Sequence, residues 1–247
     1  MRYLVLSDIH GNLEALGAAL AEAARRGYDQ LLVLGDLVGY GADPNGVIDR
    51  IRELKPIMVI RGNHDKAACG LEDAESFNLV AKSAVHWTYE MLTVENRGYL
   101  ERLPAGPQIV DELIEICHGA PFDEDAYIFD ELDALRALAQ SRRPVCLFGH
   151  THFPIAFYLS QRGLGASEAT GAAEFVVEVK SGVKYLINPG SVGQPRDGDP
   201  RAAFAIADTA RSHVGLYRVS YAVTEAQAKV KNAGLPVVLA DRLGIGR

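Results

Sequence analysis

Short apolar runs alternate with segments of helical periodicity over the first two thirds of the chain. Three of these runs are RYLVLSD, QLLVLGD and IMVIRGNHD, and none has the alternating polar face of a half-buried strand. Between the first two, Leu13, Leu16 and Leu20 recur at the spacing of one helix face. Strands that are apolar throughout are buried on both faces, and helices that connect parallel strands provide that cover. The alternation therefore predicts an α/β fold built from βαβ units.

Residues 66–105 interrupt the alternation with a helical pattern that ends at Pro104. Two further apolar strands, ELIEICHG and PVCLFGHTH, come after it, and the segment between them contains another helix around Leu132 to Leu138. We therefore interpret 66–105 as a helical excursion between strands.

After Ile155 the pattern changes to short strands separated by turns that contain Gly, Ser and Asp. Such hairpin signals predict antiparallel strands that form a second sheet. The small and polar residues 163–174 are expected to form a hairpin tip, and a helix and tail at 222–247 close the chain. The sequence has no internal repeat and no long linker, so we expect a single domain over residues 1–247, with two packed sheets and outer helices.

The net charge and the cysteine content restrict the kinds of partner and the compartment that we expect for the chain. The formal net charge of −7 gives the chain no overall basic field, so we expect no binding to a nucleic acid duplex. The cysteines Cys69, Cys117 and Cys146 have no paired spacing and are interpreted as buried thiols in a reducing compartment. The apolar start is interrupted by Asp8, which fits neither a signal peptide nor a membrane span. We expect a cytoplasmic protein without a membrane partner.

Residue types that bind metals follow five of the predicted strands. Five of the seven histidines lie at these strand ends, where chance would scatter them. If the five strands lie parallel in one sheet, their carboxyl ends meet at one edge, which is where open α/β sheets bind ligands. Imidazole and carboxylate ligands without thiolate suit two divalent ions of Mn, Fe, Zn, Ni or Co. The residues at these ends are Asp8, His10, Asp36, Asn63, His64, His118, His150 and His152.

The segments DIH, GDLVGYG, GNHD, CHG and GHTH resemble, in this order, the motif series of the calcineurin-like metallophosphoesterases. NPGSVGQPR at 188–196 is similar to a segment of the compact bacterial and archaeal members. The resemblance implies a two-sheet β-sandwich flanked by helices, in four αββα layers. It also implies a division of the metal ligands: Asp8, His10 and His152 for the first ion, Asn63, His118 and His150 for the second, and Asp36 as the bridge between both.

The resemblance places His64 near the substrate, as proton donor or stabiliser of the transition state. A water shared by two cations is far more acidic than bulk water, so a metal-bridging hydroxide is the expected nucleophile. No Ser or Cys nucleophile is then required. The two cations outweigh the charges of Asp8 and Asp36, so the site would attract phosphate although the chain as a whole is acidic.

Two further residues are candidates for substrate binding. Asn12 could contact substrate or cap the helix that follows it. Arg196 could reach phosphate or belong to a turn held by Pro195 and Gly198.

One motif departs from better-known members of the family. Gly39-Tyr40 stand where protein phosphatases and dinucleoside tetraphosphatases carry Asp-Arg or a similar Arg. The departure argues against protein phosphatase activity. It also leaves open what orients His64, for which the adjacent Asp65 is one candidate.

Together these features predict a dinuclear-metal-dependent phosphoesterase that hydrolyses small phosphodiesters or phosphomonoesters. A nucleotide phosphatase or pyrophosphohydrolase is the alternative within catalysis. A non-catalytic binding scaffold of the same fold is a third possibility, which is less favoured because every ligand position is filled.

Overall fold

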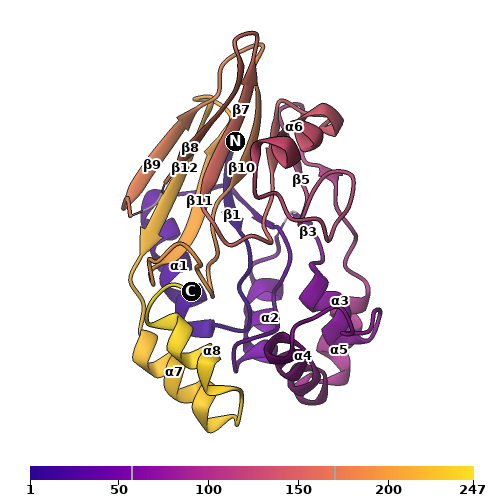
Figure 1. Ribbon diagram of the computed structural model, residues 1–247. Helices are drawn as coiled ribbons and strands as arrows, with labels where there is room; N and C mark the ends of the chain where they lie inside the picture. The colour runs from indigo at the N-terminus through magenta and orange to yellow at the C-terminus, as the bar shows by residue number, and fades with distance from the viewer. Residues whose placement is uncertain (57, 170) are drawn as a thin grey trace.

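Two six-stranded sheets stack face to face in the computed structural model of the chain (Figure 1). The structure describes residues 1–56, 58–169 and 171–247. Side chains from both sheets, among them Val5, Leu34, Leu147 and Ile187, form the core between the sheets. Helices pack on the two outer faces, which confirms the predicted four-layer α/β sandwich.

The first sheet combines the amino-terminal strands with strands from late in the chain. In spatial order it consists of β3 (Met58–Val59), β2 (Gln30–Val33), β1 (Arg2–Leu6), β11 (Ala202–Asp208), β12 (His213–Val219) and β9 (Glu174–Glu178). β1, β2 and β3 are parallel, as βαβ units require, whereas β11, β12 and β9 pair antiparallel. The carboxyl ends of the three parallel strands therefore reach the same edge.

The second sheet is built in the same way around a parallel centre. In spatial order it consists of β4 (Gln108–Ile109), β5 (Ile114–Ile116), β6 (Val145–Leu147), β10 (Lys184–Asn188), β7 (Ile155–Ser160) and β8 (Gly163–Glu168). β5, β6 and β10 are parallel, and β4, β7 and β8 pair antiparallel.

Helices cover the sandwich on both outer faces and at one end. Those in the described ranges are α1 (Leu13–Arg26), α2 (Pro44–Glu53), α3 (Asn63–Cys69), α4 (Leu79–Met91), α5 (Val94–Glu101), α6 (Glu131–Gln140), α7 (Val223–Asn232) and α8 (Val237–Leu243). α1 and α2 cover the first sheet, and α6 covers the second. Figure 1 shows α7 and α8 near α1, at the end of the sandwich where α3, α4 and α5 also lie. Within the described ranges, the helices fall short of the length and apolarity needed to span a membrane.

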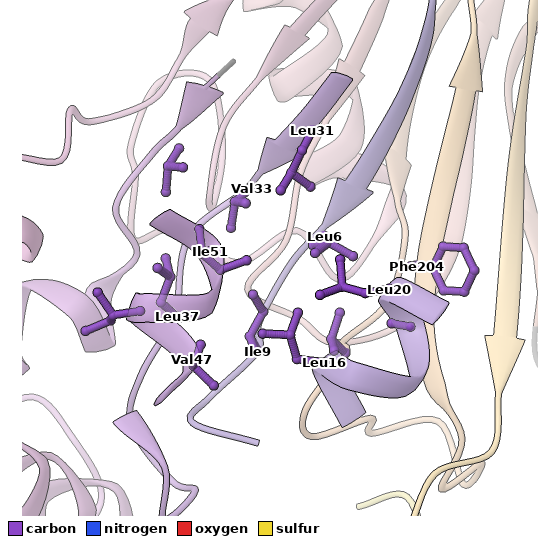
Figure 2. Close-up of a cluster of buried hydrophobic side chains, with 14 of the residues drawn as sticks. Leu6, Ile9, Leu16, Leu20, Leu31, Val33, Leu37, Val47, Ile51 and Phe204 are labelled. Carbon is purple, nitrogen blue, oxygen red and sulfur yellow. The ribbon is translucent and has the colours of Figure 1, made fainter. Parts of the chain in front are cut away.

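Both faces of β1 are buried, which explains its apolar sequence. Val5 faces the core between the sheets, whereas Leu6 faces the helical layer. In Figure 2, Leu16 of α1 and Phe204 of β11 belong to the same buried cluster as Leu6. This packing on two sides holds the end of β1, and the residues just beyond it, in a fixed position.

The five polar strand ends belong to two sheets rather than to one edge of a single sheet. β1, β2 and β3 lie in the first sheet, and β5 and β6 lie in the second. The strands after residue 155 do not form a sheet of their own either, because they extend both sheets. An apolar run shows that a strand is buried but does not specify its neighbour, so both sequence-based expectations were wrong.

Local boundaries also differ from the prediction. Segment 163–174, expected to be a hairpin tip, contains β8, which pairs with β7 along its whole length through backbone hydrogen bonds. The tail after α7 contains α8, whose Leu239 and Leu243 are buried. The helical excursion predicted at 66–105 begins earlier, because α3 starts at Asn63. A weak or short apolar pattern accounts for the first two differences.

Candidate metal centre and substrate hollow

The loops that follow the parallel strands bring the predicted ligands together between the two sheets. Asp8, His10, Asp36 and His152 form one buried cluster, and Asp36, His118 and His150 form another. Within each cluster the potential ligand atoms all lie within 4.8 Å of one another. Asp36 belongs to both clusters. Asn63 joins the second, because its Oδ1 lies 3.3 Å from Nε2 of His118.

The ligand atoms of the first cluster point at one another across a small space. Nε2 of His10 lies 3.0 Å from Nε2 of His152, which in turn lies 3.3 Å from Oδ1 of Asp8. Oδ2 of Asp36 lies 3.6 Å from Nε2 of His10 and 3.5 Å from Nε2 of His118. Oδ2 of Asp36 is buried and has no hydrogen-bond partner among the described residues. Converging lone pairs, with one buried carboxylate oxygen that lacks an internal partner, are an arrangement that suits a cation.

Backbone carbonyls fix which nitrogen of each imidazole is available. In three of the four histidines of the clusters, Nδ1 donates to a carbonyl oxygen, which places a proton on Nδ1 and leaves Nε2 as the nitrogen that can bind a metal. The pairs are His10 with Val38 (3.0 Å), His118 with Leu34 (2.8 Å) and His152 with Gln194 (2.6 Å). His150 is reversed, because its Nε2 donates to the carbonyl of Asp125 at 3.1 Å and its Nδ1 stays free. The residues present therefore fit two metal ions.

The backbone at most of these positions adopts an uncommon conformation. Asp8, His10, Asp36, His150 and His152 have φ between 50° and 66°, in the left-handed region. Each such residue costs on the order of 1 kcal/mol or more, so it persists only where its surroundings impose it. Hydrogen bonds between the loops impose it here, including Asp8 N to Gly35 O at 3.1 Å and His10 N to Asp36 O at 3.0 Å. Strain of this kind is concentrated at functional sites.

The electrostatics of the clusters favour positive charge beside Asp36. Burial alone would raise the pKa of Asp36, but the imidazoles of His118 and His64 outweigh it and hold this pKa well below its usual range. Burial would lower the pKa of His118, yet the Asp36 carboxylate raises it to about 10, so a metal that bound Nε2 would displace a proton from it. A buried carboxylate that stabilises a neighbouring cation to this extent is a suitable partner for a metal.

His64 lies beside the clusters without belonging to either. Its ring packs against the rings of Tyr40, Phe77 and His10, at 4.4, 4.8 and 4.9 Å between centroids. Its backbone N–H donates to Oδ1 of Asp36 at 2.9 Å, and its Nδ1 has no partner among the described residues. Burial lowers the pKa of His64 to about 4, so the imidazole is neutral at pH 7. The aromatic contacts of Tyr40 and Phe77 were not foreseen, because the sequence does not show which aromatics reach the site.

Asp65 does not orient the His64 ring. Its Oδ1 accepts from the backbone N–H of Val38 at 3.2 Å, and its Oδ2 accepts from that of Gly62 at 3.1 Å. Asp65 therefore ties the start of α3 to the loop after β2. Within that loop, Gly39 has a φ of 102°, and a Cβ there would lie 2.5 Å from Nδ1 of His64. Only glycine allows the ring to lie so close to this loop.

The two candidate substrate residues differ in placement. Oδ1 of Asn12 caps α1 by accepting from Ala15 N at 3.0 Å, and its Nδ2 donates to Gly193 O at 2.9 Å. This buried side chain is occupied within the chain, so the structure favours the capping alternative over substrate binding. Arg196 is half-buried, and its Nη2 donates to the hydroxyl of Tyr40 at 3.3 Å. The guanidinium of Arg196 is therefore hydrogen-bonded to Tyr40, whose ring packs against the ring of His64.

A hollow of about 310 Å³ opens beside the clusters. Its lining includes Asn63, His64 and His150, together with the aromatic rings of Tyr40, Phe77 and Tyr127. Phe77 comes from the loop before α4, so the helical excursion does form part of the crevice wall.

The fold and the two clusters define a candidate metalloprotein of the α/β sandwich class. The Calcineurin-like phosphoesterase superfamily domain matches residues 1–212, and the chain belongs to this superfamily. Buried Asp/His clusters that could hold two ions agree with the metal dependence of the family.

Individual relatives agree with this assignment. A metallophosphoesterase from Sphaerobacter thermophilus superposes with a TM-score of 0.87 at 38% identity, covering 100% of this chain and 99% of that one. An uncharacterized protein of Methanocaldococcus jannaschii is 36% identical over 98% of this chain and 97% of its own length. The phosphodiesterase YfcE of Escherichia coli K12 is 27% identical over 84% of this chain and 88% of its own.

Proposed function

We propose that the chain is a dinuclear-metal-dependent hydrolase of small phosphodiesters or phosphomonoesters. The observation that carries this proposal is the pair of buried clusters that share Asp36. The similarity to a protein named as a phosphodiesterase supports the same reaction class. No described ligand position of the motif series is replaced, so nothing in this site favours the scaffold alternative.

In this proposal Asp8, His10 and His152 hold one ion, Asn63, His118 and His150 hold the other, and Asp36 binds both. When bound, two such ions supply Lewis acidity toward a shared water and toward the phosphoryl oxygens. The chain contributes fixed orientation, because carbonyl hydrogen bonds hold the imidazoles before any ligand arrives.

His64 and Arg196 would act on the substrate itself. The neutral imidazole of His64 has an N–H that can donate to a phosphoryl or leaving-group oxygen in the hollow. Arg196 would bind a phosphoryl oxygen, with its guanidinium positioned by the Tyr40 hydroxyl.

The experiment that tests the proposed function is removal and return of metal. The chain is treated with a chelator and then reloaded with Mn²⁺, Zn²⁺, Ni²⁺ or Co²⁺. We expect hydrolysis of bis(4-nitrophenyl) phosphate to disappear and then to return with at least one of these ions. Parallel assays with a phosphomonoester, a nucleotide and pyrophosphate separate a diesterase from a nucleotide phosphatase or pyrophosphohydrolase. A chain that binds no metal and gains no activity would support the scaffold instead.

Replacement of Arg196 tests its contact with phosphate. We expect Arg196→Met to raise KM for bis(4-nitrophenyl) phosphate by about tenfold, the loss of roughly one charge-assisted hydrogen bond. Arg196→Lys keeps the charge without the guanidinium fork, so its KM should lie between those of the wild type and Arg196→Met. Metal content serves as the control, and an unchanged KM in Arg196→Met would assign this residue to the turn alone.

All three cysteines are free and buried, and Sγ of Cys117 lies 3.6 Å from Sγ of Cys146. A cytoplasmic location remains part of the proposal.

A further inference from the structure

The hollow beside the clusters has two aromatic walls. Tyr127 stacks on the ring of His150, with 3.8 Å between centroids and 24° between planes, and is still 43% exposed. Phe77 packs on the ring of His64 in the same lining. The two aromatic side chains therefore pack on the two histidines that line the hollow beside the clusters.

Part of the remaining wall of the hollow is acidic. Glu72 and Asp125 belong to the lining, and no lysine or arginine does among the residues that the structure describes. Lys66 pairs with Glu72 at 2.8 Å and with Asp125 at 2.6 Å.

The same ion-pair network reaches Glu124. Lys66 lies 3.3 Å from Glu124, and Arg61 lies 2.8 Å from it. Three carboxylates therefore face two cations in this network, which leaves a formal charge of −1. A second phosphate in the hollow would meet this charge without a cation of its own, because Arg196 is assigned to the phosphoryl group that is cut.

We infer that the hollow binds a planar, uncharged aromatic group of the substrate, such as a phenyl ring or a nucleobase. The substrate class is then an aryl or nucleoside phosphodiester rather than a polyphosphate. The inference deepens the proposed function and rests on it for the position of the phosphorus atom. Stacking between aromatic rings supplies the affinity, and the acidic wall disfavours added negative charge.

Binding of two phosphonates that differ only in the attached group tests the inference without turnover, because their C–P bond is not an ester bond. We expect calorimetric titration of the metal-loaded chain to show phenylphosphonate binding at least about tenfold more tightly than methylphosphonate. In Tyr127→Leu and Phe77→Leu this ratio should fall below about threefold. Tyr89→Leu is the matched control, because Tyr89 is a similarly exposed tyrosine of α4 outside the hollow and should keep the wild-type ratio.

Equal affinity for the two phosphonates in the wild type, or a preference that survives both substitutions, would overturn the inference. So would hydrolysis of pyrophosphate, which has no aromatic group, with a kcat/KM equal to that for bis(4-nitrophenyl) phosphate. The proposed hydrolysis and the aromatic hollow can be contradicted independently. A retained phenyl preference without any hydrolysis contradicts the proposed function and supports the aromatic hollow, whereas hydrolysis without the preference contradicts the hollow alone.

Discussion

Asp36→Ala should lower kcat/KM for bis(4-nitrophenyl) phosphate by more than about 1000-fold. Asp36 is the one residue common to both clusters, and its buried Oδ2 faces imidazole nitrogens of each. Removing it leaves two cations without the negative charge between them, so both should bind more weakly. Metal content by mass spectrometry and steady-state kinetics at saturating Mn²⁺ measure the two effects.

A conservative variant separates charge from shape at this position. Asp36→Asn keeps an oxygen that can accept from the backbone N–H of His64 but removes the charge. We expect its activity to be as low as that of Asp36→Ala. Asp241→Ala, on α8 at the surface, is the control for a lost aspartate away from the site. Metal-replete Asp36→Ala with activity near that of the wild type would contradict a shared bridging ligand.

His64→Ala should lower kcat by about 10²- to 10⁴-fold while the metal content stays unchanged. We expect this because His64 belongs to neither cluster, whereas its ring lines the hollow beside them. A group that acts on the substrate and not on the metals should affect turnover alone. Steady-state kinetics and metal analysis of the same preparation provide the measurement.

Leaving-group dependence distinguishes the two roles considered for His64. If the neutral imidazole donates a hydrogen bond to the leaving oxygen, His64→Ala should slow esters of phenol much more than esters of 4-nitrophenol, whose phenolate departs readily without that bond. An equal loss for both would indicate donation to an oxygen that stays on phosphorus. Loss of bound metal in His64→Ala would place this residue among the ligands instead.

Much of the site could be predicted because its signals are local. An apolar run that ends in Asp, Asn or His marks both a buried strand and a polar end, and five such ends occur in a specific order. Asp8 and His152 are 144 positions apart in the sequence, but each is recognisable from its own few neighbours. The distribution of their strands over two sheets was not predictable in this way, because pairing depends on the whole core.

Features that depend on contacts between distant parts of the chain could not be predicted from local sequence signals. The left-handed backbone of the ligand residues is imposed by hydrogen bonds from neighbouring loops, as with His10 and the carbonyl of Asp36. The aromatic surroundings of His64 depend on Phe77, which lies on another element and carries no motif. The sequence allows Asn12 both a helix cap and a contact to substrate, and its hydrogen-bond partners identify the cap.

The central claim is that two ions share Asp36, and electron paramagnetic resonance of the Mn²⁺-loaded chain tests it most directly. We expect the wild type to bind two equivalents and to give the signal of an exchange-coupled pair, because one carboxylate contacts both clusters. Asp36→Ala should lose this signal. Isolated six-line Mn²⁺ spectra from a fully loaded wild type, or a coupled pair that persists in Asp36→Ala, would contradict the account.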